Sequence, residues 1–308
     1  MQKTCIVLVG PTAIGKTDLA IQLAQHFSTE IISADSRQCY QELNIGVAKP
    51  TASQLKLVHH HFINSHTIHQ LLSAADFEHY ALSAIDTIFQ KNDIALVVGG
   101  TGLYIKALCE GLDQIPAVAE NIRTDIVHNY QLFGFDWLTQ QLHAEDEMYV
   151  VHGEMKNPQR MMRALEVKRG TGQSIVSFQS KLKKQRPFQI IKIGLQFPRV
   201  SLYERINTRV DIMMEAGLLD EVAQLQHFQS LNALQTVGYS ELFDYFNGEI
   251  KLEDAVNLIK QNTRHYAKRQ MTWFAKDPEI TWHSPDFSQV LQSIEILRNQ
   301  TAKTSPQT

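Results

Sequence analysis

The stretch near the N-terminus that decides the fold reads Gly10-Pro11-Thr12-Ala13-Ile14-Gly15-Lys16-Thr17. It matches the phosphate-binding pattern GxxxxGK[ST] at every fixed position. It lies between the apolar run Thr4–Val9 and residues 16–27, whose apolar side chains recur at helical spacing. A loop in this context turns backbone N–H groups and the start of a helix toward a phosphate. We therefore predict a diphosphate site built from all eight residues.

Two side chains of this loop carry the expected chemistry. Lys16 would place a positive charge beside the diphosphate. The Thr17 hydroxyl would help to hold Mg²⁺, whose other ligands would be phosphate oxygens and water. Because the loop recognises a diphosphate and not an adenine ring, a nucleotide and any other diphosphate ester both remain open as ligands.

Strand-like and helix-like segments alternate outward from the loop. Residues 30–34 and 94–98 have the character of buried strands, and residues 74–89 have helical periodicity. This alternation predicts an α/β protein, in which a parallel sheet has helices on both faces.

The pattern changes after about residue 112. Helical periodicity runs on to residue 186, and it includes a helix expected to start at Asn157-Pro158 and to stop at Gly170. Strand character returns at residues 188–195, and residues 201 onward are again helical, with one long helix at 252–275. We therefore expect an α/β core in two parts (1–114 and 188–300), an all-helical insertion (115–187) and a disordered tail (301–308).

Composition bounds the class of protein. The chain has 308 residues, 44% hydrophobic and 20% charged, which excludes disorder, collagen and coiled coil as descriptions of the whole. No apolar run approaches the roughly 20 residues that span a bilayer. The N-terminus is a poor signal peptide, and the three cysteines form no CxxC pair. We expect a cytoplasmic protein without a membrane span or a cysteine zinc site.

A carboxylate is missing where P-loop hydrolases commonly have one. Their buried strand ends in an Asp that helps to hold the metal, whereas residues 94–98 are followed by Gly99-Gly100-Thr101-Gly102. The missing carboxylate argues against a motor protein or a nucleotide-dependent switch. The Thr101 hydroxyl instead suits a contact with phosphate or with a substrate atom.

Asp35 is the nearest acid at the end of a predicted strand. The carboxyl ends of strands line the ligand crevice of an open α/β sheet, so Asp35 should lie near the phosphate loop. A carboxylate there could take a proton from an attacking nucleophile. The alternative is an ordinary helix cap or turn residue.

One segment is strongly basic although the whole chain has a formal charge of −3. Between residues 156 and 186 nine basic residues face one acid, Glu166, for a local charge of +8. Such a cluster fits a polyanion such as RNA, or it is only a solvated surface. The nine are Lys156, Arg160, Arg163, Lys168, Arg169, Lys181, Lys183, Lys184 and Arg186.

Arg205 and Arg209 lie one helical turn apart. Either could neutralise a departing phosphate if its helix faces the crevice, or could pair on the surface with Glu204 or Asp211.

We expect the histidines and the aromatic residues of two other segments to have structural roles and not functional ones. His59, His60, His61, His66 and His69 lack metal-site spacing and are expected to be exposed or hydrogen-bonded on a loop. Trp273 and Phe274 are expected in the core, because aromatic residues at helical spacing usually pack inward.

The chain closely resembles the bacterial tRNA dimethylallyltransferases, also called tRNA isopentenyltransferases. The resemblance covers roughly residues 3–282 and rests on an ordered set of motifs. In addition to residues 10–17 they are Asp35-Ser36-x-Gln38-x-Tyr40, Ile45-Gly46-x-Ala48-Lys49-Pro50, Gly99-Gly-Thr-Gly-Leu-Tyr104, Pro158-Gln159-Arg160-x-x-Arg163-Ala-Leu-Glu166, Gly238-Tyr239 and Tyr266-Ala-Lys-Arg-Gln-Met-Thr-Trp273.

The resemblance implies a fold and a reaction. The fold is a P-loop kinase-like core with a helical insertion. The reaction transfers a dimethylallyl group from dimethylallyl diphosphate to the exocyclic amine of adenosine 37, in the anticodon stem-loop of tRNA. Diphosphate is released, Mg²⁺ is required, and the target base is flipped into a channel. We expect a monomer.

The resemblance also implies roles for individual residues. Asp35 corresponds to the general base, Thr101 to the residue that assists at the bridging oxygen, and Arg209 to the arginine that stabilises the diphosphate. The positions that correspond to tRNA contacts are Asp35, Ser36, Arg37, Gln38, Thr101, Arg123, Gln159, Arg160, Met161, Met162 and Arg163. Arg37 and Cys39 occupy positions where the family mostly has apolar residues, and His59 occupies a position where the family commonly has proline.

Two alternative functions share the loop. An ATP-dependent kinase for a small molecule or nucleotide would have the same core and no need of the basic insertion. A non-catalytic P-loop RNA-binding protein would bind tRNA and leave it unchanged.

Overall fold

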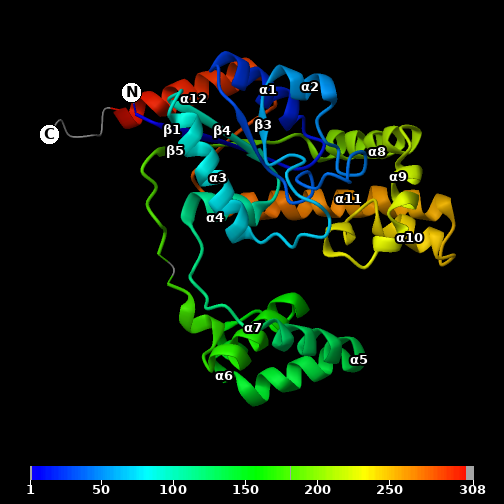
Figure 1. Ribbon diagram of the computed structural model, residues 1–308. Helices are drawn as coiled ribbons and strands as arrows, with labels where there is room; N and C mark the ends of the chain where they lie inside the picture. The colour runs from blue at the N-terminus through cyan, green and yellow to red at the C-terminus, as the bar shows by residue number, and fades with distance from the viewer. Residues whose placement is uncertain (1, 181, 303–308) are drawn as a thin grey trace. The chain divides into compact units, whose positions relative to one another are not determined.

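A six-stranded, entirely parallel sheet forms the centre of the main unit, in the strand order β3-β2-β4-β1-β5-β6 (Figure 1). The computed structural model describes residues 2–180 and 182–302. Lys181 and residues 303–308 of the expected tail therefore lie outside the described part of the chain. The strands are β1 Thr4–Val9, β2 Ile31–Ala34, β3 His60–His61, β4 Ile94–Gly99, β5 Gln189–Leu195 and β6 Ile280–His283.

Helices cover both faces of this sheet, which confirms the predicted α/β class. Ile6 and Leu8 of β1 belong to one apolar cluster with residues of α1 and α12. Figure 1 shows α3 and α4 on the other face, where the rings of Phe77 and Tyr104 stack with centroids 4.4 Å apart. The helices of this unit are α1 Lys16–His26, α2 Ala52–Leu57, α3 Ala74–Phe89, α4 Gly102–Glu110, α8 Arg199–Glu215, α9 Leu218–Gln224, α10 Ser240–Phe246, α11 Leu252–Phe274 and α12 Phe287–Ala302.

Strand register brings the functional loops to one edge of the sheet. Val9 of β1 and Ala34 of β2 both pair with Gly99 of β4. The loops that follow these three strands therefore emerge side by side at their carboxyl ends, where α/β proteins bind ligands. The approach is close, because a Cβ on Gly99 would lie 2.1 Å from the carbonyl oxygen of Ala34.

A second compact unit, Glu110–Lys184, has a helical core of its own. Its elements are α5 Glu120–Glu145, α6 Glu147–His152, α7 Pro158–Thr171 and the short 3₁₀ helix η1 Ile175–Phe178. Leu138, Leu142 and Leu165 are among its fully buried residues. The other unit comprises Met1–Cys109 and Gln185–Thr308, so these bounds differ by a few residues from those expected.

Helix α7 begins as predicted and ends later than predicted. The Asn157 side chain accepts hydrogen bonds from the N–H groups of Gln159 and Arg160, and Pro158 occupies the first turn. The expected stop at Gly170 is wrong. The helix continues through Gly170, where the lack of a side chain allows close packing on Val118, and Gly172, with φ of 75°, supplies the left-handed C-cap.

Two further expectations are corrected. His60 and His61 form an edge strand where a loop was expected. Trp273 is 36% exposed and packs against Gly102, whereas its neighbour Phe274 is buried as predicted. Strand β6 carries only partly buried residues after Ile280 and gives little hydropathy signal.

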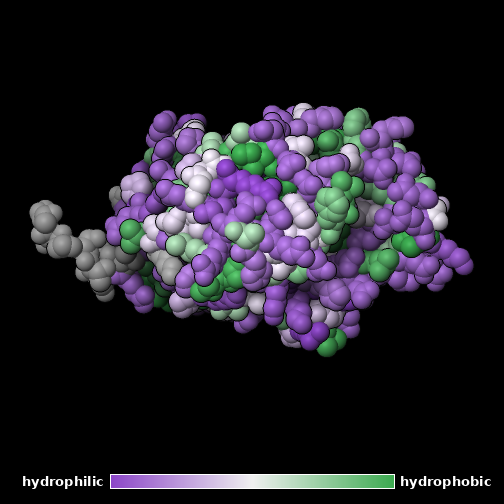
Figure 2. Space-filling view, turned by 90° about the horizontal axis from the view of Figure 1, so that it is seen from below, coloured by the Kyte–Doolittle hydropathy of each residue, from purple (hydrophilic) through white to green (hydrophobic). Residues whose placement is uncertain are grey.

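Within residues 2–180 and 182–302, no helix is both long enough and apolar enough to cross a bilayer. Figure 2 shows one face of the molecule, on which hydrophilic side chains predominate and hydrophobic ones form small separate patches.

Candidate active site

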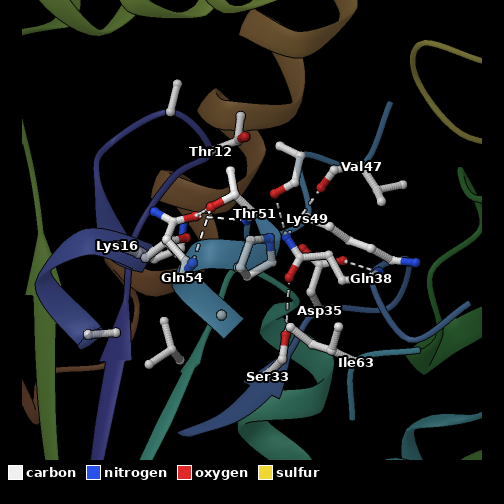
Figure 3. Close-up of a pocket in the computed structure, with 18 of the residues that line it drawn as sticks. Thr12, Lys16, Ser33, Asp35, Gln38, Val47, Lys49, Thr51, Gln54 and Ile63 are labelled. Atoms are coloured by element: carbon white, nitrogen blue, oxygen red, sulfur yellow. Dashed lines mark hydrogen bonds between the residues drawn. The ribbon is translucent and has the colours of Figure 1, made fainter. Parts of the chain in front are cut away.

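A cavity of about 710 Å³ lies at the carboxyl ends of β1, β2 and β4 (Figure 3). It is lined by the phosphate loop from Thr12 to Thr17, by Asp35, by residues 44, 45 and 47–52, and by two arginines of α8. Gly10 and Pro11 are buried beneath the loop, where their carbonyl groups accept hydrogen bonds from Lys16. The structure thus brings six of the eight predicted loop residues to one cavity and places the other two behind it.

The phosphate loop has the backbone conformation that its sequence predicts. Gly15, at the N-cap of α1, has φ of 100°, a left-handed value that suits glycine. The Lys16 ammonium group lies 3.0 Å from the Gly10 carbonyl oxygen and 2.7 Å from that of Pro11. The pKa of Lys16 is lowered to about 7, chiefly by burial; Asp35 opposes this shift and Arg209 adds to it. An anion in the cavity would favour the charged form of this lysine.

Two arginines of α8 complete a cationic wall. Arg205 donates a hydrogen bond to the Ala13 carbonyl oxygen at 2.9 Å and lies over the Phe197 ring. Burial lowers the pKa of Arg209, and the charge of Arg205 lowers it further. The alternative of a pair with Asp211 is not observed, because Asp211 pairs with Lys260. Both arginines line the cavity with Lys16, so three basic side chains face the same space.

Asp35 is both a turn residue and a cavity residue. Its Oδ1 accepts hydrogen bonds from the N–H groups of Arg37 at 2.9 Å and Gln38 at 3.2 Å. A carboxylate has further lone pairs, so this turn does not exhaust its capacity to accept a proton. The two expectations for Asp35 are therefore compatible.

The Gln38 side chain ties this turn to its neighbours (Figure 3). Its Nε2 donates to the carbonyl oxygens of Val47 and Ala48, both at 3.2 Å, and its Oε1 accepts from the Ser33 hydroxyl. Gln38 therefore links β2, the Asp35 turn and the loop of residues 44–50.

Thr101 lies next to the Asp35 turn. Its Oγ1 accepts a hydrogen bond from the Ser36 N–H at 3.1 Å, and its own N–H donates to the Ala34 carbonyl oxygen. Burial, aided by Asp35, raises the pKa of the Tyr266 hydroxyl to about 12, while Arg37 and Thr101 act to lower it. Tyr266 therefore remains a protonated hydrogen-bond donor at neutral pH.

A second cavity of about 580 Å³ adjoins the first. It is lined by the Asp35 turn, residues 46–48, residues 235–238 and side chains of α11. The residues that line both cavities are Thr12, Asp35, Val47, Ala48, Arg209, Met213 and Tyr266. One cavity is thus rich in phosphate-binding groups, the other reaches Asp35 from a different side, and both belong to the same compact unit.

Gln270 is a site residue to which the sequence analysis gave no role. Its Oε1 accepts from the Thr12 N–H and its Nε2 donates to the Gly100 carbonyl oxygen, both at 2.9 Å. A Cβ on Gly100 would lie only 2.1 Å from that Nε2. Gln270 therefore bridges the phosphate loop and the turn after β4. The motif Tyr266–Trp273, in which it lies, was the only sequence signal that could have pointed to this role.

Glu221 was also missed, because its partners are distant in the chain. Its carboxylate accepts hydrogen bonds from the N–H groups of Asn44, Ile45 and Gly46 at 2.8–3.1 Å. It accepts a fourth, at 2.6 Å, from the hydroxyl of the fully buried Tyr239. A Cβ on Gly46 would lie 2.5 Å from the Tyr239 ring, so glycine permits this contact. We call these four hydrogen bonds, together with this packing, the Glu221 clamp.

The donor set of the first cavity suits a hard cation. Side-chain oxygens of Thr17, Asp18, Ser33 and Asp35 line it, and oxygen ligands are those that Mg²⁺ prefers. Diphosphate chemistry generally uses a divalent metal ion for charge neutralisation. The residues present therefore fit such an ion.

The predicted RNA-contact residues of the helical unit divide into two groups. Gln159 and Arg160 are exposed at the start of α7, whereas Met161 and Met162 are buried in the core of the unit and act as packing residues. Arg123 is exposed and Arg163 is partly exposed, and both pair with the buried carboxylate of Glu166, at 2.9 and 2.5 Å.

Other basic residues of this segment have structural partners. Arg169 pairs with Glu145 at 2.7 Å, and Arg186 pairs with Glu78 at 2.6 Å in the core unit. The local charge of +8 therefore overstates the basic surface that is available to a polyanion.

A family model described as IPP transferase matches residues 38–277. The chain belongs to the IPP transferase family. The match covers more than half of the chain and includes the Asp35 turn from Gln38 onward, the Gly99-Gly100 turn and α11.

Two relatives match the sequence of this chain over nearly its whole length. It is 46% identical to tRNA dimethylallyltransferase 1 of Phocaeicola vulgatus, over 97% of this chain and 98% of the relative. It is 47% identical to the tRNA dimethylallyltransferase of Christiangramia forsetii, over 93% and 95% of the two chains.

Solved structures show the same family. The crystal structure of a tRNA isopentenylpyrophosphate transferase from Bacillus halodurans has a TM-score of 0.69 and 34% identity, covering 97% of this chain and 96% of its own. A eukaryotic dimethylallyltransferase described as acting on tRNA has a TM-score of 0.80 and 26% identity, covering 99% of this chain and 81% of its own.

Proposed function

We propose that this IPP transferase is a tRNA dimethylallyltransferase. It transfers a dimethylallyl group from dimethylallyl diphosphate to the exocyclic amine of adenosine 37, in the anticodon stem-loop of tRNA, and releases diphosphate. The names of the relatives support the transferase reaction. The observation that carries the assignment to this site is the meeting of two cavities at Asp35 and Arg209, one of them lined by the phosphate loop.

The cationic wall binds the leaving group. As the allylic C–O bond breaks, the diphosphate departs with the bonding electron pair and its bridging oxygen gains negative charge. Lys16, Arg205 and Arg209 line the cavity where that charge develops, and fixed positive groups there lower the barrier. Because the diphosphate is a leaving group, no hydrolytic acid is needed in the turn after β4.

Asp35 acts as the general base. The adenine amine is a weak nucleophile, so its placement beside the allylic carbon and the removal of its proton both matter. The N–C bond forms as the C–O bond breaks, and the amine proton passes to the Asp35 carboxylate. The turn that fixes Oδ1 also fixes the direction of this carboxylate.

Thr101 assists from beside this turn, where its hydroxyl accepts a hydrogen bond from the Ser36 N–H. We assign it to the bridging oxygen and to the substrate nucleoside. Mg²⁺, with Thr17 among its ligands, would add charge neutralisation at the diphosphate.

The acceptor base reaches the site by leaving its stack, since a cavity of this kind cannot admit a paired base. Asp35, Ser36, Arg37 and Gln38 would contact the flipped nucleotide and its neighbours. Arg123, Gln159, Arg160 and Arg163 of the helical insertion would contact the tRNA backbone, with Met161 and Met162 packed beneath them. We expect the chain to act as a cytoplasmic monomer.

Transfer of label separates the proposed reaction from its alternatives. The protein is incubated with Mg²⁺, dimethylallyl diphosphate labelled in the prenyl group, unmodified tRNA and ATP labelled at its γ-phosphate. We expect prenyl label in tRNA and no transfer of phosphoryl label from ATP to tRNA or to another acceptor. Phosphoryl transfer without prenyl transfer would establish a kinase, and tRNA binding without either would establish a binding protein.

A further inference from the structure

Three potential metal ligands converge at the edge of the sheet, where β2 and β3 begin. They are Glu30, His59 and His61, and their nearest ligand atoms all lie within 4.8 Å of one another. None of the three lines the diphosphate cavity. The reaction proposed above makes no use of them.

Strand register explains why these side chains meet. Ile31 pairs with His60 and Ile32 with His61, so Glu30 lies beside His59. Side chains alternate between the faces of a strand, so His59 and His61 share a face and His60 takes the other. The His59 and His61 rings are 4.5 Å apart at 90°, and His61 Nε2 lies 2.6 Å from Glu30 Oε2.

The ligand set has a recognisable preference. Two imidazoles and one carboxylate bind Zn²⁺ and similar transition metals, and leave positions for water. Mg²⁺ prefers oxygen ligands alone, so it would not compete at this edge. The side chains of His61 and Glu30 are 15% and 35% exposed and His59 is exposed, so an ion can enter from solvent.

A small movement would complete the site. Ligand atoms around a tetrahedral Zn²⁺ with bonds of about 2.0–2.1 Å lie farther apart than a hydrogen-bonded pair. Binding would therefore replace the His61–Glu30 hydrogen bond with two metal bonds and draw in the His59 ring. Only side-chain rotation at the surface is required, and β2 and β3 already hold the backbone in place.

We propose that Glu30, His59 and His61 form a binding site for a divalent transition metal ion of the Zn²⁺ type, separate from the diphosphate site. The ion would join the two edge strands of the sheet. The neighbouring His60 lines the diphosphate cavity, and its Nδ1 lies 2.9 Å from the Val58 carbonyl oxygen. An ion at this site would thus restrain the strand that carries a residue of that cavity.

Calorimetric titration of the tag-free full chain with ZnCl₂, in excess Mg²⁺, tests the proposal. We expect one Zn²⁺ per chain, with binding weakened about tenfold or more in His59→Ala and in Glu30→Gln. His79→Ala is the matched control, because His79 is an exposed histidine on α3 outside the cluster. Circular dichroism shows that each variant is folded.

Two further readouts make the outcome decisive. An ion that binds only the folded chain raises its melting temperature, so Zn²⁺ should stabilise the wild type and His79→Ala more than His59→Ala. Cobalt(II) should give visible absorption bands that His59→Ala loses. Equal Zn²⁺ affinity in all variants, or no binding by the wild type, would overturn the proposal. Neither result would affect the proposed transferase reaction.

Discussion

Asp35 shows how a residue that holds a turn can also be placed in a cavity where chemistry is proposed. Its position at the end of a strand predicted nearness to the phosphate loop, and the structure places it in that cavity. The sequence could not show that the same carboxylate also holds a turn through Oδ1. This double role decides which substitution tests its chemistry.

Asp35→Asn separates the two roles. The amide oxygen can still accept from the N–H groups of Arg37 and Gln38, but it cannot take the amine proton. We expect single-turnover transfer to fall about 10²–10⁴-fold with little change in tRNA affinity, measured by rapid quench and gel shift. Asp35→Ala, which also loses the turn, is the comparison. Unchanged single-turnover chemistry in Asp35→Asn would remove it from the base role.

Lys49 gives a prediction on pH. Burial lowers its pKa to about 8 from 10.5. Between pH 8 and pH 10.5 the unfolded chain binds more protons than the folded chain. The contribution of Lys49 to the free energy of unfolding is therefore fully present above pH 10.5 and is lost as the pH falls through 8. From about pH 7.5 to about pH 9.5, the free energy of unfolding in urea should rise relative to that of Lys49→Met. A constant difference between the two proteins would contradict this assignment.

At the scale of elements, the strand, loop and helix from Thr4 to His26 could be read from sequence, because apolar runs, glycines and helical spacing are local signals. Strand β3 could not, since two histidines have no strand pattern and pair only because β2 presents an edge. The Glu221 clamp could not be predicted either, because it joins residues about 175 positions apart.

The clamp should hold the loop that lines both cavities. Glu221→Ala frees three loop N–H groups and the Tyr239 hydroxyl, so we expect a loss of stability of about 1–3 kcal/mol. Because residues 44–48 line the cavities, the KM for dimethylallyl diphosphate should rise more than kcat falls. Glu221→Gln, which keeps an acceptor, should recover part of both. Denaturation curves and steady-state kinetics measure these effects, and a lower stability with unchanged KM would limit the clamp to a structural role.

At the scale of the whole molecule, a nearly neutral chain contains one strongly basic segment, residues 156–186. The sequence located that segment, yet side-chain partners decide how much of it can bind RNA. Arg169 is held by Glu145, and Arg163 by the buried Glu166. Arg160 is exposed at the start of α7 and, within the described chain, makes no ion pair. Charge counting cannot distinguish these cases, because ion pairs depend on tertiary structure.

Arg160→Ala should weaken tRNA binding and reduce the slope of log K against log salt by about one. Lys168→Ala removes the same charge from the same helix, but Lys168 bonds to the Gly172 carbonyl oxygen at the far end of α7. Lys168→Ala should therefore change the slope less than Arg160→Ala does. Filter binding over a series of salt concentrations gives both slopes, and equal slopes for the two variants would count against a contact at residues 159–163.

The most direct test of the account is the mass of one nucleoside. Unmodified tRNA is incubated with the protein, Mg²⁺ and dimethylallyl diphosphate, then digested and analysed by mass spectrometry, beside a tRNA with guanosine at position 37. We predict a prenylated adenosine from the first tRNA, with one diphosphate released for each, and no product from the second. An unchanged adenosine with folded protein, or prenylation that persists without adenosine 37, would contradict the account.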